Sequence, residues 1–99
     1  MTNFDYEIRD RLAWVTFDSG AMNTLSKAAI EELGRLRAKM EQAHGEDRIE
    51  GVILKGNRYG LGAGANIGEL LGASTEQLAA LIDQGHEQLT AIEEGRLPW

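Results

Sequence analysis

Residues 51–70 read GVILKGNRYGLGAGANIGEL, an apolar run followed by a glycine-rich stretch. Val52, Ile53 and Leu54 form a continuous apolar segment between glycines, which predicts a strand covered on both faces. Four glycines then fall within residues 60–69. Because glycine loses more conformational entropy on ordering than any other residue, such a cluster indicates a backbone that turns tightly or approaches a ligand closely.

The segments on the N-terminal side of this stretch predict an α/β arrangement. Residues 4–10 alternate apolar and polar side chains, and residues 12–17 are rich in β-forming types, so both are expected to be strands, with Trp14 in the core. Ser26 is a favourable N-cap for a helix that ends at Gly45. The apolar residues of this helix step by four and three: Ala29, Leu33, Leu36, Met40 and Ala43. Strand, helix and strand together predict parallel pairing with a right-handed crossover.

Two further helices are expected on the C-terminal side. Asn66 can cap one or two helical turns over residues 66–71. Ser74 and Gln77 form the pattern of a capping box, which predicts a helix over residues 75–94. Its apolar stripe again steps by four and three: Leu78, Ile82, Gly85, Leu89 and Ile92. The predicted order is therefore β-β-α-β-α-α.

Composition narrows the class of protein. Ninety-nine residues with 42% apolar content favour one domain, and no apolar run approaches the length of a membrane span. The N-terminal residues lack the pattern of a signal peptide, so a cytoplasmic location is expected. The absence of cysteine excludes disulfides and thiolate nucleophiles, and two separated histidines do not suggest a metal site. A net charge of −6 argues against a nucleic-acid surface.

Three interpretations of the glycine-rich stretch compete. Gly60, Gly62 and Ala65 match the dinucleotide-binding pattern G-x-G-x-x-G/A, although residues 57–59 separate it from the preceding strand. Small residues could instead serve only to let a helix pack closely against a strand. The third interpretation is an oxyanion site, because free N–H groups and the positive end of the helix dipole coincide at a helix N-terminus.

A family resemblance favours the oxyanion interpretation. LGAGANIGEL at 61–70 resembles the F-S-A-G-A-D-I/L-x-E-L/M signature of the crotonase superfamily, the enoyl-CoA hydratase/isomerase proteins. Further segments similar to that family follow in the same order: AWVTFDSGAMNTLSKAAIEEL at 13–33, RIEGVILKGN at 48–57 and EEGRLPW at 93–99. The resemblance implies that residues 1–99 form the N-terminal part of a crotonase-type ββα spiral, an incomplete domain.

The resemblance also implies a substrate and a site. Crotonase-family proteins bind acyl-CoA thioesters and stabilise an enolate with two backbone N–H groups, the first of which corresponds to that of Ala65. The residues implied in CoA binding, by motif position, are Met22, Leu25, Ala63, Ala65, Asn66 and Ile67. The CoA thioester is the substrate, and neither a cofactor nor a metal is implied.

Three departures from the family pattern bear on activity. Asp18, Ser19 and Gly20 stand where the family has Asn-Arg-Pro, which removes a proline and a basic residue near the CoA entrance. Asn66 stands where the family has aspartate, and Gly62 replaces a serine or alanine, but neither change removes a backbone donor. The second oxyanion donor and the catalytic glutamates lie beyond the position of Trp99 in the family. The chain alone is therefore expected to be inactive. The alternatives are a non-catalytic module that self-associates as a homo-oligomer or binds a partner, since a truncated fold exposes strand edges, and a dinucleotide-binding βα turn. No nucleic-acid or membrane partner is expected.

Overall fold

The computed structural model describes residues 3–20, 23, 25–57 and 72–99 of the chain. The elements in this part are β1 (Phe4–Arg9), β2 (Leu12–Phe17), α1 (Lys27–Gly45), β3 (Gly51–Lys55) and α3 (Thr75–Glu94). The α/β class and these five predicted elements are confirmed. The short helix predicted over residues 66–71 lies outside the described residues.

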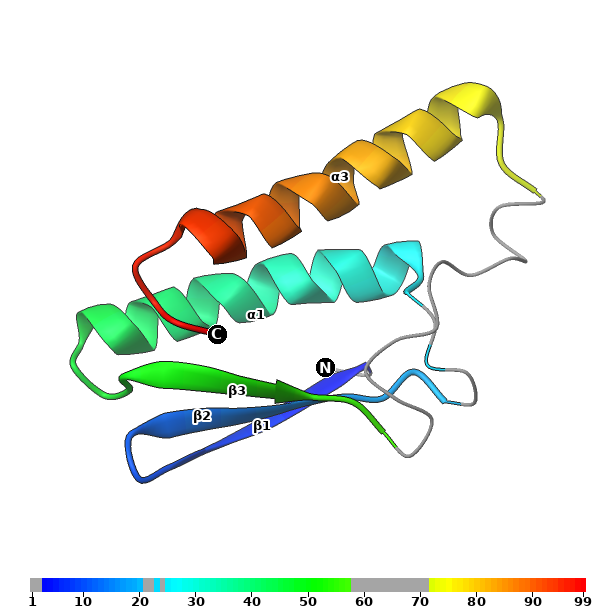
Figure 1. Ribbon diagram of the computed structural model, residues 1–99. Coiled ribbons are helices and arrows are strands. Elements are labelled where there is room, and N and C mark those ends of the chain that lie inside the picture. Colours follow the sequence, from blue (N-terminus) through cyan, green and yellow to red (C-terminus); the bar gives the residue numbers. More distant parts are fainter. Residues whose placement is uncertain (1–2, 21–22, 24, 58–71) are drawn as a thin grey trace.

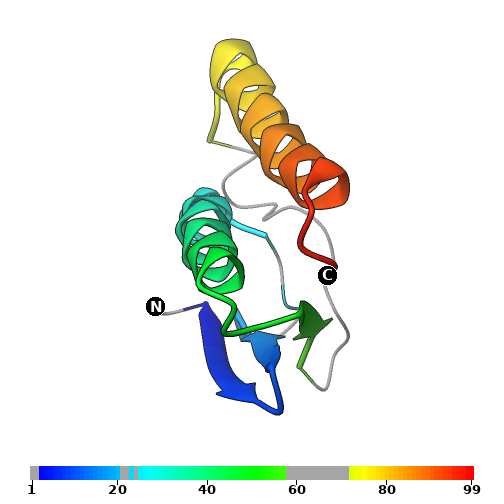
Figure 2. The same ribbon diagram turned by 90° about the vertical axis from the view of Figure 1, so that its left-hand side faces the viewer.

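The three strands form one sheet in the order β1-β2-β3. β1 and β2 pair antiparallel as a hairpin, and β2 and β3 pair parallel, with α1 as the crossover between them. Figures 1 and 2 show that α1 lies over one face of the sheet and that α3 lies alongside α1, in a layer farther from the sheet. The predicted β-α-β unit with parallel pairing is therefore present.

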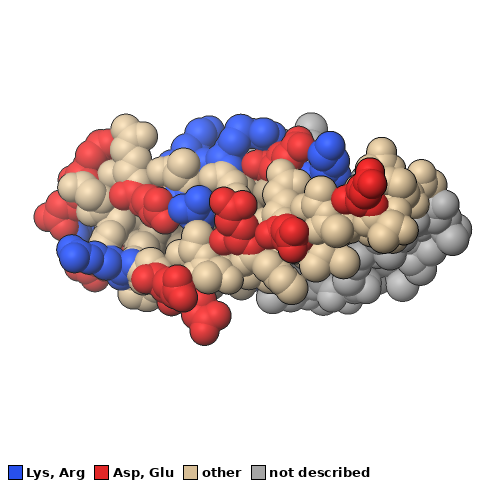
Figure 3. Space-filling view, turned by 90° about the horizontal axis from the view of Figure 1, so that it is seen from above, with Lys and Arg blue, Asp and Glu red and all other residues tan. Residues whose placement is uncertain are grey.

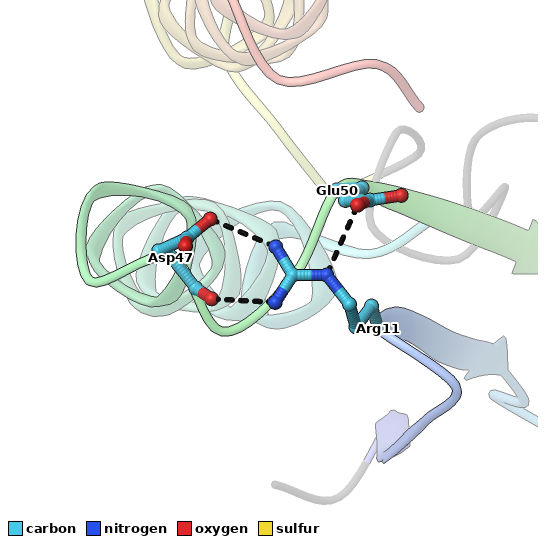
Figure 4. A network of polar contacts seen from close by, with 3 residues as sticks. All are labelled: Arg11, Asp47 and Glu50. Carbon is cyan, nitrogen blue, oxygen red and sulfur yellow. Dashed lines mark hydrogen bonds and ion pairs between the residues drawn. The ribbon is translucent and has the colours of Figure 1, made fainter.

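The hairpin turn between β1 and β2 is fixed to the loop that precedes β3. Asp10 and Arg11 have φ values of 55° and 63°, the left-handed conformation that suits a two-residue hairpin loop. Arg11 donates hydrogen bonds from Nε to Glu50 at 3.0 Å and from Nη2 to Asp47 at 2.8 Å (Figure 4). The hydrogen bond to Asp47, followed by that to Glu50, raises the pKa of Arg11 above its usual value. Because this cluster is exposed to water, we assign it a role in loop geometry.

The hydrophobic core lies between α1 and one face of the sheet. Phe4 and Phe17 stack with ring centroids 4.9 Å apart at one end of this face. The predicted stripe of α1 is confirmed, since Ala29, Leu33, Leu36, Met40 and Ala43 are all buried in this core. The residues that meet it from the strands are Phe4, Ala13, Val15, Phe17 and Val52.

The opposite face of the sheet corrects two predictions. The register places Trp14 beside Ile53 on this face, which no other described element covers. Ile53 is 41% exposed, so the prediction that β3 is covered on both faces is wrong. Trp14 is only partly buried, so the prediction that it belongs to the core is also wrong. Its indole N–H donates to the Arg9 carbonyl at 3.3 Å, and the Arg9 guanidinium lies 4.7 Å from its ring centroid.

The C-terminal residues return to the sheet beside β3. Leu97 is 3% exposed and joins the core cluster. The backbone N–H of Val52 donates to the carbonyl of Pro98 at 2.8 Å. Because the other edge of β3 is paired with β2, residues 97–99 lie along the edge of β3 that is remote from β2.

Candidate functional site at the carboxyl ends of β2 and β3

The parallel strands β2 and β3 end at the same edge of the sheet, where both of the following loops begin. Figure 1 shows that the N-terminal ends of α1 and α3 lie at this same end of the molecule. In open α/β sheets, ligands bind in the crevice beyond the carboxyl ends of parallel strands. This end is therefore the candidate site, and the Arg11 cluster lies at the opposite end.

Asn23 holds the loop that follows β2. Its side chain is fully buried, and its φ of 46° lies in the left-handed region, which asparagine tolerates better than most residues. The amide of Asn23 donates to the Phe17 carbonyl at 3.0 Å, and its Oδ1 accepts from the Ser19 N–H at 2.8 Å. One side chain thus satisfies backbone groups at the end of β2 and fixes the direction in which the chain leaves the strand.

Asn57 joins the loop after β3 to the loop after β2. Its Nδ2 donates to the Asp18 carboxylate at 3.0 Å and to the Gly20 carbonyl at 2.8 Å. The Asp18 carboxylate also accepts from the Gly20 N–H at 3.0 Å. The hydrogen bond from Asn57, followed by that from Gly20, lowers the pKa of Asp18 below the ordinary aspartate value. Asp18 is therefore a carboxylate at neutral pH and acts here as a hydrogen-bond acceptor.

The start of α1 carries positive potential toward this site. Ser26 caps the helix by accepting from the Ala29 N–H at 3.1 Å, as predicted. The first turn contains no acidic residue, and Lys27 lies in it. Since unpaired N–H groups and the helix dipole give a helix N-terminus a partial positive charge, this end of α1 favours an anionic group.

An open cavity of about 590 Å³ lies between the start of α1 and the N-terminal half of α3. Its volume falls within the range of roughly 300–1,000 Å³ that is typical of small-molecule sites. The described residues that line it are Lys27, Glu31, Gly72, Ala73, Gln77, Ala80, Leu81 and Gln84. Gly72 and Ala73 follow directly after the glycine-rich stretch, so the chain emerges from that stretch at the cavity wall.

The structure places one of the six predicted site residues. Leu25 is half-buried and packs against the hydrophobic core, immediately before the cap of α1. The other five, Met22, Ala63, Ala65, Asn66 and Ile67, lie outside the described residues, so their roles stay predictions. The sequence-based reasoning did not identify Asn23 or Asn57. A signal for both was the occurrence of asparagine in turn-forming segments that directly follow strands.

Neither a metal centre nor a membrane helix is found in the part of the chain that the structure describes. No group of three or more histidine, aspartate or glutamate side chains in this part is arranged to hold an ion. Among the same residues, no helix combines the length and the apolar character needed to cross a bilayer. Figure 3, which looks down onto the α3 side, shows acidic and basic groups interspersed with uncharged surface.

Comparisons with known proteins identify the fold. No family model and no curated protein matches the sequence. A solved structure from Legionella pneumophila, named as an enoyl-CoA hydratase/isomerase (crotonase), matches 99% of this chain with a TM-score of 0.79 and 18% identity. One from Hyphomonas neptunium, named as an enoyl-CoA hydratase/isomerase family protein, matches 97% with a TM-score of 0.79 and 23% identity. An enoyl-CoA hydratase/isomerase family protein from Pseudomonas syringae matches 91% with a TM-score of 0.73 and 26% identity.

These solved structures are much longer than the chain. The matched region accounts for 38% of the Legionella protein, 37% of the Hyphomonas protein and 36% of the Pseudomonas syringae protein. The agreement nevertheless extends over nearly all of the 99 residues and includes both helices and the mixed sheet. The chain therefore has the fold of a part of the enoyl-CoA hydratase/isomerase (crotonase) structures.

Proposed function

We propose that this chain is the N-terminal part of an enoyl-CoA hydratase/isomerase-type domain and that it binds the CoA portion of an acyl-CoA thioester. The observation that carries the proposal is the agreement of almost the whole chain with solved structures named for that activity. The sequence LGAGANIGEL at 61–70 supports it independently, because it resembles the oxyanion-loop signature of the same superfamily.

In this proposal, the backbone N–H of Ala65 donates a hydrogen bond to the thioester carbonyl oxygen. As that oxygen gains negative charge in an enolate, a preorganised donor lowers the barrier by about 3–4 kcal/mol. The small side chains at positions 63–65 leave room for the substrate against the backbone. Met22, Leu25, Asn66 and Ile67 line the CoA channel.

The charge and the volume of the described part of the site suit an anionic ligand such as CoA. The helix dipole at the start of α1, together with Lys27, favours the phosphate groups of CoA. The open cavity beside Gly72 offers volume next to the glycine-rich stretch. Asn57 and Asp18 tie together the loops that leave β2 and β3, and so fix the frame from which that stretch departs.

The chain alone is proposed to bind without turning over its ligand. Hydration of an enoyl thioester needs a general base to activate water and an acid to deliver a proton. The resemblance assigns both groups to glutamates beyond the position of Trp99, and the chain spans only 36–38% of the solved structures reported above. Incubating the purified chain with crotonyl-CoA should therefore give no loss of the enoyl thioester absorbance above the buffer rate.

Titration calorimetry with acetoacetyl-CoA tests binding. We expect saturable heat with acetoacetyl-CoA. We expect no heat with NAD, the ligand that the chain would bind if the glycine-rich stretch were a dinucleotide-binding turn. Ala65→Pro, which removes the N–H donor, should weaken acetoacetyl-CoA binding at least about tenfold, the effect of losing one hydrogen bond to a charged group. Ala65→Ser keeps the donor and is the matched control. Heat with NAD alone, or equal affinity for the proline and serine variants, would reject the assignment of Ala65.

A further inference from the structure

We infer that Asn57 is a positioning residue for the proposed CoA site, because its side chain joins the two segments that carry the residues predicted to contact CoA. The inference rests on the proposed function. It assigns an effect on ligand affinity to a side chain that the family resemblance does not include among the site residues. We call the group formed by Asp18, Gly20 and Asn57 the loop clamp.

The loop clamp lies directly beyond the last paired residues of β2 and β3. The parallel register ends with Thr16 opposite Lys55. Asp18 and Asn57 each lie two residues farther along the chain, so their side chains meet where the next pair of the same register would fall. One chain then leads to α1 and the other to the glycine-rich stretch. Side-chain hydrogen bonds therefore hold together two segments that the sheet no longer pairs.

Asn57 binds both a side chain and the backbone of the loop that follows β2. Its Nδ2 donates to Oδ1 of Asp18 at 3.0 Å and to the carbonyl of Gly20 at 2.8 Å. The same Oδ1 atom accepts from the N–H of Gly20 at 3.0 Å. Gly20 has a φ of 98°, a conformation that glycine adopts without a steric penalty. Asn57 therefore binds a turn whose shape Asp18 and Gly20 already set.

The loop after β2 is attached to the fold through Asn23. The carbonyl of Gly20 also accepts from the Asn23 N–H at 3.1 Å. The buried side chain of Asn23 in turn donates to the Phe17 carbonyl. In the sequence, Met22 and Leu25 lie one residue before and two residues after Asn23. A change in the position of Gly20 therefore acts on the part of the loop that carries both predicted CoA contacts.

The second segment held by the loop clamp begins directly after Asn57. Residues 58–71 contain four of the six predicted site residues. Asn57 fixes the chain before this segment, and the capping box at Ser74 fixes it again shortly afterwards. A ligand that contacts both segments at once needs them at one relative position. Because fixing that position in advance lowers the entropy cost of binding, the loop clamp should raise the affinity for the ligand.

The surroundings of the loop clamp suit positioning better than stabilisation. Asp18 is exposed and Asn57 is half-buried. Because water competes for exposed polar groups, hydrogen bonds between them add little to the free energy of unfolding. A displacement of about 1 Å at a site can nevertheless cost up to about a hundredfold in activity. Loss of the loop clamp should therefore lower ligand affinity more than it lowers stability.

Titration calorimetry with acetoacetyl-CoA, together with urea denaturation of the same variants, tests the inference. Asn57→Leu keeps a side chain of similar size and removes both donated hydrogen bonds. We expect it to bind about five- to tenfold more weakly, with a urea midpoint close to that of the unaltered chain. Asp18→Leu should weaken binding by a similar factor. Asp18→Asn keeps an oxygen that can accept from both Asn57 and Gly20, so its affinity should stay within about twofold of that of the unaltered chain.

Arg11→Leu is the matched control, because Arg11 also joins two loops through exposed hydrogen bonds, at the opposite end of the sheet. Its affinity should stay within about twofold of that of the unaltered chain. If the unaltered chain binds and Asn57→Leu binds as tightly as Arg11→Leu, the inference is wrong while the proposed function stands. If the unaltered chain gives no saturable heat, both are wrong. A urea midpoint that falls sharply in both Asn57→Leu and Asp18→Leu would show a general role in folding and would also overturn the inference.

Discussion

At the scale of single residues, Asn23 shows how one buried side chain sets the path of a loop. It combines a left-handed backbone with hydrogen bonds to the end of β2 and to the residues that follow. Both features belong to the loop that connects β2 to α1, and Asn57 binds that same loop from the end of β3. The frame of the candidate site therefore rests on side-chain amides.

Replacing Asn23 should be costly. Asn23→Ala removes the partner of the Phe17 carbonyl and places a Cβ-bearing residue without polar groups at a φ of 46°, so we expect a loss of about 2–3 kcal/mol in the free energy of unfolding. Asn23→Gly tolerates the backbone conformation but still lacks the amide, and we expect it to recover less than about 1 kcal/mol of that loss. Urea denaturation measures both. A full recovery in the glycine variant would mean that the amide hydrogen bonds contribute nothing.

The lowered pKa of Asp18 predicts that the stability of the fold depends on pH in the acid range. Because its pKa is lowered in the folded chain, its charged form stabilises the fold above the pKa of the unfolded state, and this contribution disappears as the pH falls through the folded pKa. Asp18→Asn keeps an acceptor oxygen for Asn57 but cannot titrate. Its urea midpoint should therefore fall less than that of the unaltered chain between roughly pH 5 and pH 2.

The control for that titration is Glu46→Gln, which changes an exposed carboxylate for which no side-chain hydrogen bond is described. Its acid profile is the reference for the loss of one surface carboxylate. If Asp18→Asn and Glu46→Gln give the same profile, the hydrogen bonds to Asp18 do not influence its ionisation enough to affect folding.

At the scale of elements, α3 differs from α1 in what stabilises it. α1 lies on the core, whereas α3 has no buried residue and depends more on local interactions. Its N-terminus carries the predicted capping box, in which Ser74 accepts from the Gln77 N–H at 3.1 Å and Gln77 accepts from the Ser74 N–H at 2.9 Å. The cap satisfies N–H groups that the helix itself cannot pair.

Ser74→Ala should destabilise the first turns of α3 by about 1 kcal/mol. Hydrogen exchange at the amides of that region should accelerate about fivefold, while the amides of α1 should be unaffected because the buried residues of α1 pack in the core on the sheet. Thr75→Ala, at the exposed neighbouring position, is the control. Equal exchange in the two variants would show that the capping box does not stabilise α3.

At the scale of the whole molecule, exposure separates two leucines of the C-terminal region. Leu97 follows α3 and is 3% exposed within the core, whereas Leu89 lies in α3 and is 55% exposed. Leu97→Ala should therefore lower the free energy of unfolding by about 2–4 kcal/mol. Leu89→Ala should change it by less than about 0.5 kcal/mol. Thermal unfolding at low protein concentration, where self-association does not contribute, measures this difference.

Equal losses in these two variants would contradict the arrangement of the C-terminal residues along β3. The same arrangement is supported by the hydrogen bond from Val52 to Pro98. This hydrogen bond joins the C-terminal residues to the free edge of β3.

Much of the fold and part of the candidate site could be predicted from periodicity and turn chemistry. The helix predicted to start after Ser26 and to end at Gly45 is confirmed, as are the 75–94 helix and the strand over 12–17. The first strand ends at Arg9, one residue before its predicted end, and β3 extends one residue beyond each end of the predicted apolar run. Leu25 lies beside the site frame, while the other predicted site residues stay predictions.

The wrong predictions concern which side chains are buried. Trp14 and Ile53 were expected inside because their residue types favour burial, yet the described chain has nothing to place over that face of the sheet. Glu32 shows the opposite case: a charged residue on a predicted helix is 5% exposed, and it accepts hydrogen bonds from the Asn3 N–H at 2.9 Å and its side chain at 3.2 Å. A carboxylate can be buried where hydrogen-bond donors from a distant segment meet it. The local sequence pattern around the carboxylate does not predict such donors.

The sequence by itself determined the type, order and caps of the described elements, because these depend on interactions between residues that are close along the chain. Only the tertiary structure decided which face of each element is covered, since covering depends on elements that are distant in sequence. α3 makes the distinction plain: its four-and-three stripe predicted a helix with an apolar side, but the packing of α1 against the flank at Gln88 left Ile82 and Leu89 open.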